Sequence, residues 1–346
     1  MRRPLIALGV VAITVLAVAA AYVLRIGPLV PPAPRRSVVF VAISRSTDEA
    51  DAREGEAIDL DAGTRDLFDA GGRITAMALS ADRRSLYVAL DGGKIVCLDA
   101  TTGSVFGGVD LHGPTIASLV PTADGRTLFA VTVTNIQSAV VPIDLATRKS
   151  ADPITFTMTA GPAVIRGDAL FVPLGDPQRL QVAFIDLATR AVTSRLTLPR
   201  GSLVPAAAVR LGDSRTGLIT WDPGFTGGGA GLRLYSVTDP LHWADVLLQA
   251  PLPQGLGRST AVGLQAAATA DGTIHVCSTS GTSARRYVVS ADLRGTLAGA
   301  DCGLLAGGDR IVMAKRDPPQ LTVLDDRSGV ALHSLPLAGV PARIVH

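Results

Sequence analysis

Residues 74–105 of this 346-residue chain contain four short apolar segments separated by tight turns, and this pattern strongly constrains the fold. Ile74–Leu79 and Leu86–Leu90 alternate apolar and polar residues, and Asp91-Gly92-Gly93 turns the chain back into Lys94–Leu98. A further turn, DATTG, leads into the fourth segment. Alternation with a period of two and glycine-containing turns are typical of β-hairpins. The stretch therefore predicts an antiparallel meander of four strands.

Weaker copies of this unit recur every 35 to 50 residues or so. The ends of the expected third strands are Ile58-Asp59-Leu60, Leu98-Asp99-Ala100, Ile143-Asp144-Leu145, Ile185-Asp186-Leu187 and Leu324-Asp325-Asp326, with degenerate versions near Tyr235-Ser236-Val237 and Val289-Ser290-Ala291. We expect each aspartate to accept backbone N–H groups in the turn after its strand. Seven units of four strands with a period near forty predict a seven-bladed β-propeller.

The two ends of the repeat region complement each other. The first unit starts at Ser37 with SVVFVAIS, which corresponds to a second strand, so it lacks an inner strand. The last unit is followed by GVPARIVH, Gly339–His346, which has strand-like character. Pairing of Ala342–Val345 with Val38–Ile43 would close the ring and remove an exposed sheet edge. We therefore expect an all-β propeller over residues 38–346, closed by the C-terminal strand.

The repeat resembles that of a known class. SADRRSLYVAL and TADGRTLFAVT, followed by IVCLDATTGSV and AVVPIDLATRKS, resemble the YVTN-type, lactonase-like repeat of bacterial propellers and also the quinoprotein-like repeat. The resemblance is best over Ile74–Ser150 and poorest in blades five and six. It implies the propeller fold but no particular function, because such scaffolds host enzymes, binding modules and structural proteins.

The N-terminal region predicts a membrane anchor. Leu5–Leu24 is free of charged residues and long enough to cross a bilayer core of about 30 Å as a transmembrane helix. Arg2 and Arg3 precede it, which favours a cytoplasmic N-terminus and an exported body. We therefore expect an anchor over residues 1–25, a stiff Pro-rich linker over 26–37, and a propeller on the extracytoplasmic side of the cell membrane.

A cleaved signal peptide is the alternative for the same segment. Ala17-Val18-Ala19 and Ala19-Ala20-Ala21 both satisfy the small-residue cleavage pattern. The apolar run continues through Leu24 and exceeds the usual apolar core of a signal peptide, which favours a retained signal-anchor.

Composition and cysteine spacing exclude some functions. Beyond residue 36 the chain has 27 basic and 30 acidic residues and no basic stripe, which argues against a nucleic-acid partner. Cys97, Cys277 and Cys302 form no CxxC pattern, so we expect no zinc site but free thiols buried in strands. A disulfide between Cys277 and Cys302 stays open for an oxidising compartment.

Catalytic motifs are not recognisable in the sequence. The five histidines lie in different units without metal-ligand spacing, and Gly227–Gly231 lacks the Lys-Ser/Thr of a phosphate-binding loop. A quinoprotein-like enzyme would need a stacking tryptophan, whereas Trp221 and Trp243 both fall in blade five. We assign no catalytic residue, metal or cofactor. A lactonase-like hydrolase or quinoprotein-like enzyme that uses the central channel is the alternative function.

Three loops are candidates for binding a partner. In a propeller, the loops between second and third strands gather on one face, and binding residues concentrate on such loops. The candidates are Ser44–Glu54, which is densely charged, Asp222–Gly231, which comes after a tryptophan, and the turn Lys315–Pro319. The residues predicted to contact a partner are Arg45, Asp48, Glu49, Arg53, Trp221, Asp222, Phe225, Lys315 and Arg316. A solvated hairpin tip or a loose insertion would explain the first two loops without a partner.

Together these features predict a membrane-tethered, extracytoplasmic propeller that acts as a protein-interaction or scaffold module. Its partners would be the membrane, through Leu5–Leu24, and a protein of the cell envelope. A related hypothesis makes it a subunit of a larger membrane complex.

Overall fold

The computed structural model describes residues 37–46, 51–134, 137–175, 179–198, 207–211, 215–222, 231–239, 242–248, 263–269, 271–280, 283–290, 294–299, 301–307 and 310–346. The chain divides into two compact units, Met1–Pro34 and Arg35–His346. The strands named below all belong to the second unit. None of the helices in the described ranges is long and apolar enough to span a membrane, and the predicted anchor Leu5–Leu24 lies outside these ranges.

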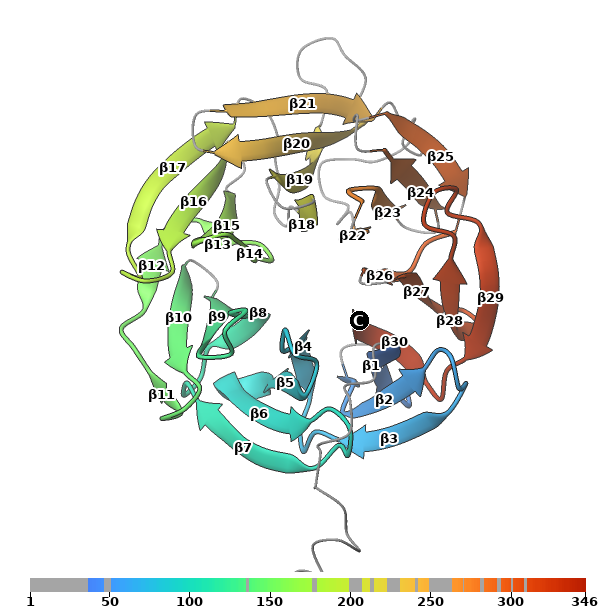
Figure 1. Cartoon of the computed structure of the whole chain (residues 1–346), viewed down its shortest axis with the longest axis horizontal. Helices are drawn as coiled ribbons and strands as arrows, with labels where there is room; N and C mark the ends of the chain where they lie inside the picture. Colours follow the sequence, from blue (N-terminus) through green and yellow to red (C-terminus); the bar gives the residue numbers. More distant parts are fainter. Residues whose placement is uncertain are drawn as a thin grey trace, which may run out of the picture. The chain divides into compact units, whose positions relative to one another are not determined.

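Seven antiparallel sheets succeed one another around a ring, as predicted (Figure 1). From the axis outward, blade 1 consists of β30 (Val340–Val345), β1 (Val38–Ser44), β2 (Glu54–Asp59) and β3 (Arg65–Asp69). Blade 2 consists of β4 (Ile74–Leu79), β5 (Ser85–Leu90), β6 (Lys94–Asp99) and β7 (Val105–Asp110), with a short 3₁₀ turn, η2 (Asp91–Gly93), between β5 and β6. Blade 3 consists of β8 (Thr115–Pro121), β9 (Thr127–Val133), β10 (Ser138–Asp144) and an outer strand split into β11 (Lys149–Ser150) and β12 (Ile154–Phe156).

The other four blades repeat this order. Blade 4 has a split inner strand, β13 (Thr159–Ala160) and β14 (Val164–Arg166), then β15 (Ala169–Gly175), β16 (Leu180–Asp186) and β17 (Val192–Leu198). Blade 5 has β18 (Ala207–Leu211), β19 (Arg215–Asp222), β20 (Gly231–Asp239) and β21 (His242–Leu248). Blade 6 has β22 (Gly263–Ala268), β23 (Ile274–Ser280), β24 (Ser283–Val289) and β25 (Gly295–Gly299). Blade 7 has β26 (Leu304–Ala306), β27 (Ile311–Arg316), β28 (Pro319–Leu324) and β29 (Ala331–Pro336).

The predicted ring closure is confirmed. β30 pairs antiparallel with β1, with Phe40 opposite Val345 and Val41 opposite Ile344. The guanidinium Nε of Arg343 donates to the carbonyl of Thr75 on β4, at 2.7 Å, and so ties the closing strand to blade 2. The C-terminal strand thus supplies the inner strand that the first unit lacks.

The core lies between neighbouring blades. β1 is buried along its whole length because one face packs on blade 2 and the other on blade 7. Phe40 joins Leu86 in the first of these contacts, and Val41 joins Val312 in the second. A strand covered on both faces needs apolar residues at consecutive positions, which explains the run VVFVAI.

The predicted aspartate turns are also confirmed. The Oδ1 of Asp99 accepts hydrogen bonds from the Thr101 and Thr102 N–H groups at 2.9 and 2.8 Å and from the Thr102 hydroxyl at 3.0 Å. Four further aspartates accept equivalent bonds: Asp59, Asp144, Asp186 and Asp325. Each turn joins the third strand of a blade to its fourth.

The turns define two faces of the ring. We call the face with the aspartate turns the Asp-turn face, and the opposite face, with the loops between second and third strands, the hairpin face. The connection from β3 to β4 lies at the hairpin face, because the Ile74 N–H donates to the carbonyl of Ala52 in the β1–β2 loop, at 2.7 Å. Ser37 lies at the Asp-turn face, where its carbonyl accepts the Leu60 N–H at 3.1 Å and its hydroxyl donates to Asp59.

Candidate functional site

The antiparallel order places the strand ends that bound the three predicted partner loops on the hairpin face, in blades 1, 5 and 7. Asp48, Glu49 and Phe225 lie outside the described residues. Trp221 and Asp222 form the last two residues of β19, and only their backbone is described.

The charged residues of the blade 1 loop pair with one another. Arg45 donates through Nε and Nη2 to the Oε2 of Glu54, at 2.9 and 2.7 Å. Arg53 donates to Asp51 at 2.9 Å, and this hydrogen bond raises the pKa of Arg53. Both ion pairs are exposed, and exposed pairs contribute little to stability. They tie Arg45 to Glu54 and Arg53 to Asp51, and all four side chains remain accessible to a partner.

The blade 7 hairpin directs its two basic residues to opposite sides. Along β27, Met313 packs toward blade 6, whereas Val312 and Ala314 pack toward blade 1. Because side chains alternate along a strand, Lys315 belongs to the side of blade 6 and Arg316 to the side of blade 1.

Lys315 is part of a charged network between blades 6 and 7. Asp301 forms ion pairs with Lys315 and, at 3.1 Å, with Arg286 of β24, which is only 4% exposed and also donates to the Gly329 carbonyl. Burial alone would raise the pKa of Asp301, but hydrogen bonds from Lys315 and Arg286 hold it below its usual value. The carboxylate therefore stays ionised and fixes two cations at this blade interface.

A cavity of about 460 Å³ adjoins this network at the hairpin face. Lys315, Arg316 and Asp301 line it together with Gln320, Cys277 and Cys302. Its volume lies in the range of small-ligand pockets. Both cysteines are free thiols, so the structure does not contain the disulfide that the sequence left open.

Positive charge extends from this cavity toward the ring axis. Burial lowers the pKa of Arg316 from its ordinary value. Surrounding protein atoms, and then the positive charge of Arg316, lower the pKa of Arg343 on the inner strand β30. Two guanidinium groups are thus held near each other on the blade 7 and blade 1 side of the ring.

The sequence pattern predicted Lys315 and Arg316 but not Arg286 and Asp301. A charged residue at the centre of the third strand SARRYVV was the available signal for Arg286. Asp301 gave none, because it lies in a connection between blades and meets its partners only in the folded ring.

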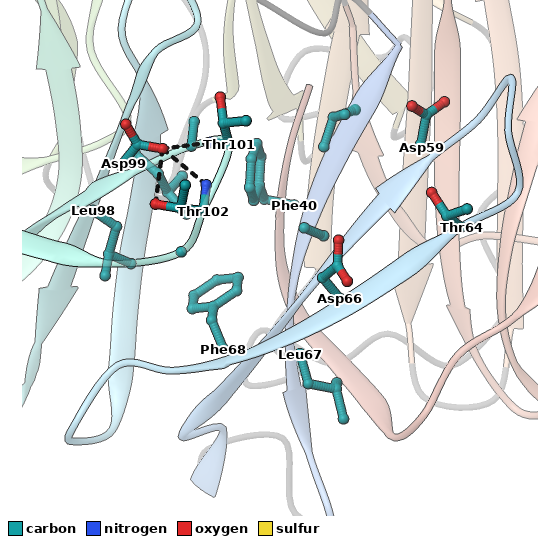
Figure 2. Close-up of a pocket in the computed structure, with 15 residues that line it drawn as sticks. Phe40, Asp59, Thr64, Asp66, Leu67, Phe68, Leu98, Asp99, Thr101 and Thr102 are labelled. Atoms are coloured by element: carbon teal, nitrogen blue, oxygen red, sulfur yellow. Dashed lines mark hydrogen bonds between the residues drawn. The ribbon is translucent and has the colours of Figure 1, made fainter. Parts of the chain in front are cut away.

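A second cavity, of about 320 Å³, lies between blades 1 and 2 at the Asp-turn face (Figure 2). Phe40, Phe68 and Leu98 form apolar walls, and the two phenylalanine rings meet edge to face with centroids 6.3 Å apart. Asp66 and Asp99 line the cavity beside these walls. Asp99 is held by its turn, whereas Asp66 makes no hydrogen bond or ion pair with any described residue.

Potential metal ligands are dispersed over the ring. Within the ranges that the structure describes, no three His, Cys, Asp or Glu side chains come together in an arrangement that could hold a metal ion.

Comparison with known proteins shows the fold alone. No family model matches this sequence, and no curated protein matches it. A solved structure of a protein from Lactobacillus plantarum is similar, with a TM-score of 0.63, 14% identity, and coverage of 89% of this chain and 98% of that one. A functionally unknown protein from Desulfotomaculum acetoxidans has a TM-score of 0.62, 13% identity, and coverage of 90% and 99%. Kuenenia stuttgartiensis hydrazine synthase has a TM-score of 0.59, 13% identity, and coverage of 79% and 89%.

Proposed function

We propose that this protein is a binding module: a propeller of the YVTN-type, lactonase-like kind that presents its hairpin face to a protein partner in the cell envelope. The observation that carries the proposal is the network of Arg286, Asp301 and Lys315 beside the cavity of blades 6 and 7. The few residues that dominate the binding energy of an interface are enriched in arginine and cluster in well-packed pockets.

The chemistry of this face suits an acidic partner surface. Lys315 and Arg316 lie at the rim of the cavity, and Arg343 adds positive charge toward the axis. Carboxylates of a partner would meet a complementary potential, which speeds encounter and selects against basic surfaces. Gln320 and the half-buried Cys302 would contact other groups of the partner.

The tether is the second part of the proposal. Leu5–Leu24 would cross the membrane once, with the propeller on the extracytoplasmic side, and the Pro-rich linker would join them. The uncharged run and the arginines before it support this placement. In one form of the proposal the anchor packs on other membrane helices, and the protein is then a subunit of a larger complex whose detergent-extracted mass exceeds that of a monomer.

A site-specific crosslink tests the binding module. A photo-reactive amino acid replaces Pro318 on the hairpin face of the full chain in native membranes, and the matched control carries it at Arg126, in the turn between β8 and β9 on the Asp-turn face. We expect a discrete protein adduct at position 318 that Lys315→Glu weakens, and no such adduct at 126. Equal labelling at both positions, or no adduct at 318, would contradict the proposal. A metal or quinone that copurifies stoichiometrically would favour the lactonase-like or quinoprotein-like enzyme instead.

A further inference from the structure

Exposed apolar side chains gather on one part of the outer rim. Among the described residues, the large apolar side chains with the greatest exposure are Leu67, Val105, Phe106, Leu297, Val330 and Leu332, at 48% to 62%. They lie on or next to β3, β7, β25 and β29, the outer strands of blades 1, 2, 6 and 7, which are consecutive in the ring (Figure 1). Single exposed apolar residues are ordinary, whereas exposed apolar side chains that lie close together mark interaction sites.

Four of these side chains also lie toward the Asp-turn face. Val105 and Phe106 begin β7 directly after the Asp99 turn. Val330 and Leu332 flank the start of β29 directly after the Asp325 turn. Two apolar pairs, which we call the rim pairs, therefore lie at the Asp-turn ends of the outer strands of blades 2 and 7, on either side of blade 1. Arg148 donates to the Phe106 carbonyl at 2.8 Å and so holds this backbone without covering the ring.

The first described residue of the propeller, Ser37, lies in blade 1, between the rim pairs. It lies at the Asp-turn face, and 36 residues precede it. The 11 residues 26–36 separate the apolar run from the propeller, and at about 3.5 Å per residue they span at most about 40 Å. If Leu5–Leu24 crosses the membrane as proposed, the Asp-turn side of blade 1 cannot lie farther from the bilayer than the length of this linker. A short tether gives the surface a high effective concentration, so weak apolar contacts suffice for docking.

The cavity between blades 1 and 2 indicates which lipid surface fits. It lies between Ser37 and the first rim pair, with Phe40 and Phe68 in its walls and Asp66 beside them (Figure 2). The carboxylate of Asp66, which makes no hydrogen bond or ion pair with any described residue, would attract the ammonium group of a zwitterionic headgroup. Aromatic ring faces also attract such a cation. A headgroup without an ammonium group, such as that of phosphatidylglycerol, offers Asp66 no cation, and its phosphate would be repelled by Asp66 and Asp99.

We propose that the Asp-turn side of blades 7, 1 and 2 rests on the surface of a zwitterionic phospholipid bilayer through the rim pairs. The hairpin face would then point away from the membrane and toward the partner. This inference rests on the proposed tether, and it adds the orientation of the ring and the lipid chemistry.

Spin labels on the full chain test this orientation. The chain carries Cys302→Ser, since Cys97 and Cys277 are buried, and one label at Val330→Cys. The matched control is Ala191→Cys, which occupies the same position after the Asp186 turn of blade 4. A third label, Gln320→Cys, reports on the hairpin face. The protein is reconstituted into phosphatidylcholine vesicles, and collisions of the label with oxygen and with a water-soluble nickel chelate are compared.

We expect the ratio of oxygen to nickel collisions at position 330 to be several-fold higher than at 191 and 320. Phe106→Glu with Leu332→Glu should remove this difference in a chain that still unfolds cooperatively. Phosphatidylglycerol in the vesicles should weaken it, and a stronger contact there would overturn the preference for zwitterionic lipid.

Three results would overturn the contact. If the chain floats with the vesicles but the labels at all three positions collide with the nickel chelate as freely as labels in water do, the rim contact is overturned and the tether is not. A label at 330 that neither reagent reaches indicates protein against the rim, such as a second copy. A chain that does not float overturns the tether and this inference with it.

Discussion

At the scale of single residues, the aspartate turns show how a side chain on the surface can fix a blade. The backbone N–H of Thr147, and then its hydroxyl, hold the pKa of Asp144 below its usual value. The pKa values of Asp99, Asp186 and Asp325 are lowered as well. Several carboxylates therefore contribute stability only while they are ionised.

Asp99→Asn should reduce the acid sensitivity of the fold. Burial acts to raise the pKa of Asp99, but bonds from Thr102 and Thr101 lower it overall. A folded-state pKa below the unfolded value of about 4 gives stability that is present above that pH and lost as pH falls through the folded-state value. We expect a melting temperature about 2 °C lower at pH 7, and a smaller further loss between pH 5 and 3 than in the wild type. Differential scanning calorimetry measures both, and Asp152→Asn, at an exposed site without a partner among the described residues, should change neither.

His275 should make the fold sensitive to pH in a higher range. Its ring is fully buried, Nε2 lies 2.7 Å from the carbonyl of Asp326, and burial lowers its pKa despite this hydrogen bond. The stability contribution is complete above the unfolded pKa of about 6.5 and declines as pH falls toward the folded-state value. We expect the melting temperature to fall between pH 7.5 and 5.5, and His275→Gln to flatten this part of the profile. His112→Asn, at an exposed position, should leave the profile unchanged; a flat wild-type profile would contradict the prediction.

At the scale of strands, prolines explain two departures from the regular four-strand pattern. β4, β5 and β6 match the predicted segments to within a residue because alternation and turns agree there, whereas β7 begins only at Val105, the last residue of the predicted four-strand stretch. The outer strand of blade 3 breaks into β11 and β12 around Pro153, and the inner strand of blade 4 breaks into β13 and β14 around Pro162. A proline has no N–H for the ladder. These two breaks come from local chemistry, whereas the meeting of Lys315 with Asp301 and Arg286 depends on the closed ring and leaves no pattern in one segment.

Glu56 should prove central to the closure of blade 1. Its carboxylate is 1% exposed and accepts the backbone N–H of Ala338, at 3.0 Å, just before the closing strand β30, and it also pairs with Arg65 at 3.5 Å. Glu56→Ala removes the buried carboxylate that accepts this N–H, and a hydrogen bond to a charged group contributes about 1.5–3 kcal/mol. We expect a lower denaturant midpoint and faster hydrogen exchange over residues 337–346.

Two substitutions separate this role from a general effect of charge. Glu56→Gln keeps an oxygen for the Ala338 N–H and should lose less stability than Glu56→Ala. Glu54→Ala breaks only the exposed pair with Arg45, worth about 0–1 kcal/mol. Equal losses for Glu54→Ala and Glu56→Ala would contradict the assignment.

At the scale of the whole molecule, the ring has distinct chemistry on its two faces. The hairpin face combines a charged interblade network with a cavity, and the Asp-turn face carries Ser37, the first described residue, between exposed apolar pairs. The C-terminal strand closes the ring, and neighbouring blades pack on each other, so the side from which the ring is tethered fixes what it presents. A tether at the Asp-turn face leaves the candidate partner loops on the opposite side.

The proposed tether predicts that the full chain behaves as an integral membrane protein. We expect it to remain in the membrane pellet after extraction with alkaline carbonate, with its N-terminal peptide intact. Leu16→Arg with Val18→Arg should release it, because each charge at the centre of a membrane helix costs about 2.5–3.5 kcal/mol. Val30→Arg adds one such charge in the linker, outside the apolar run, and should leave the protein in the pellet. A soluble wild-type chain that begins after Ala19 or Ala21 would identify a cleaved signal peptide. Without a tether, nothing would then hold the Asp-turn side of the ring toward the membrane.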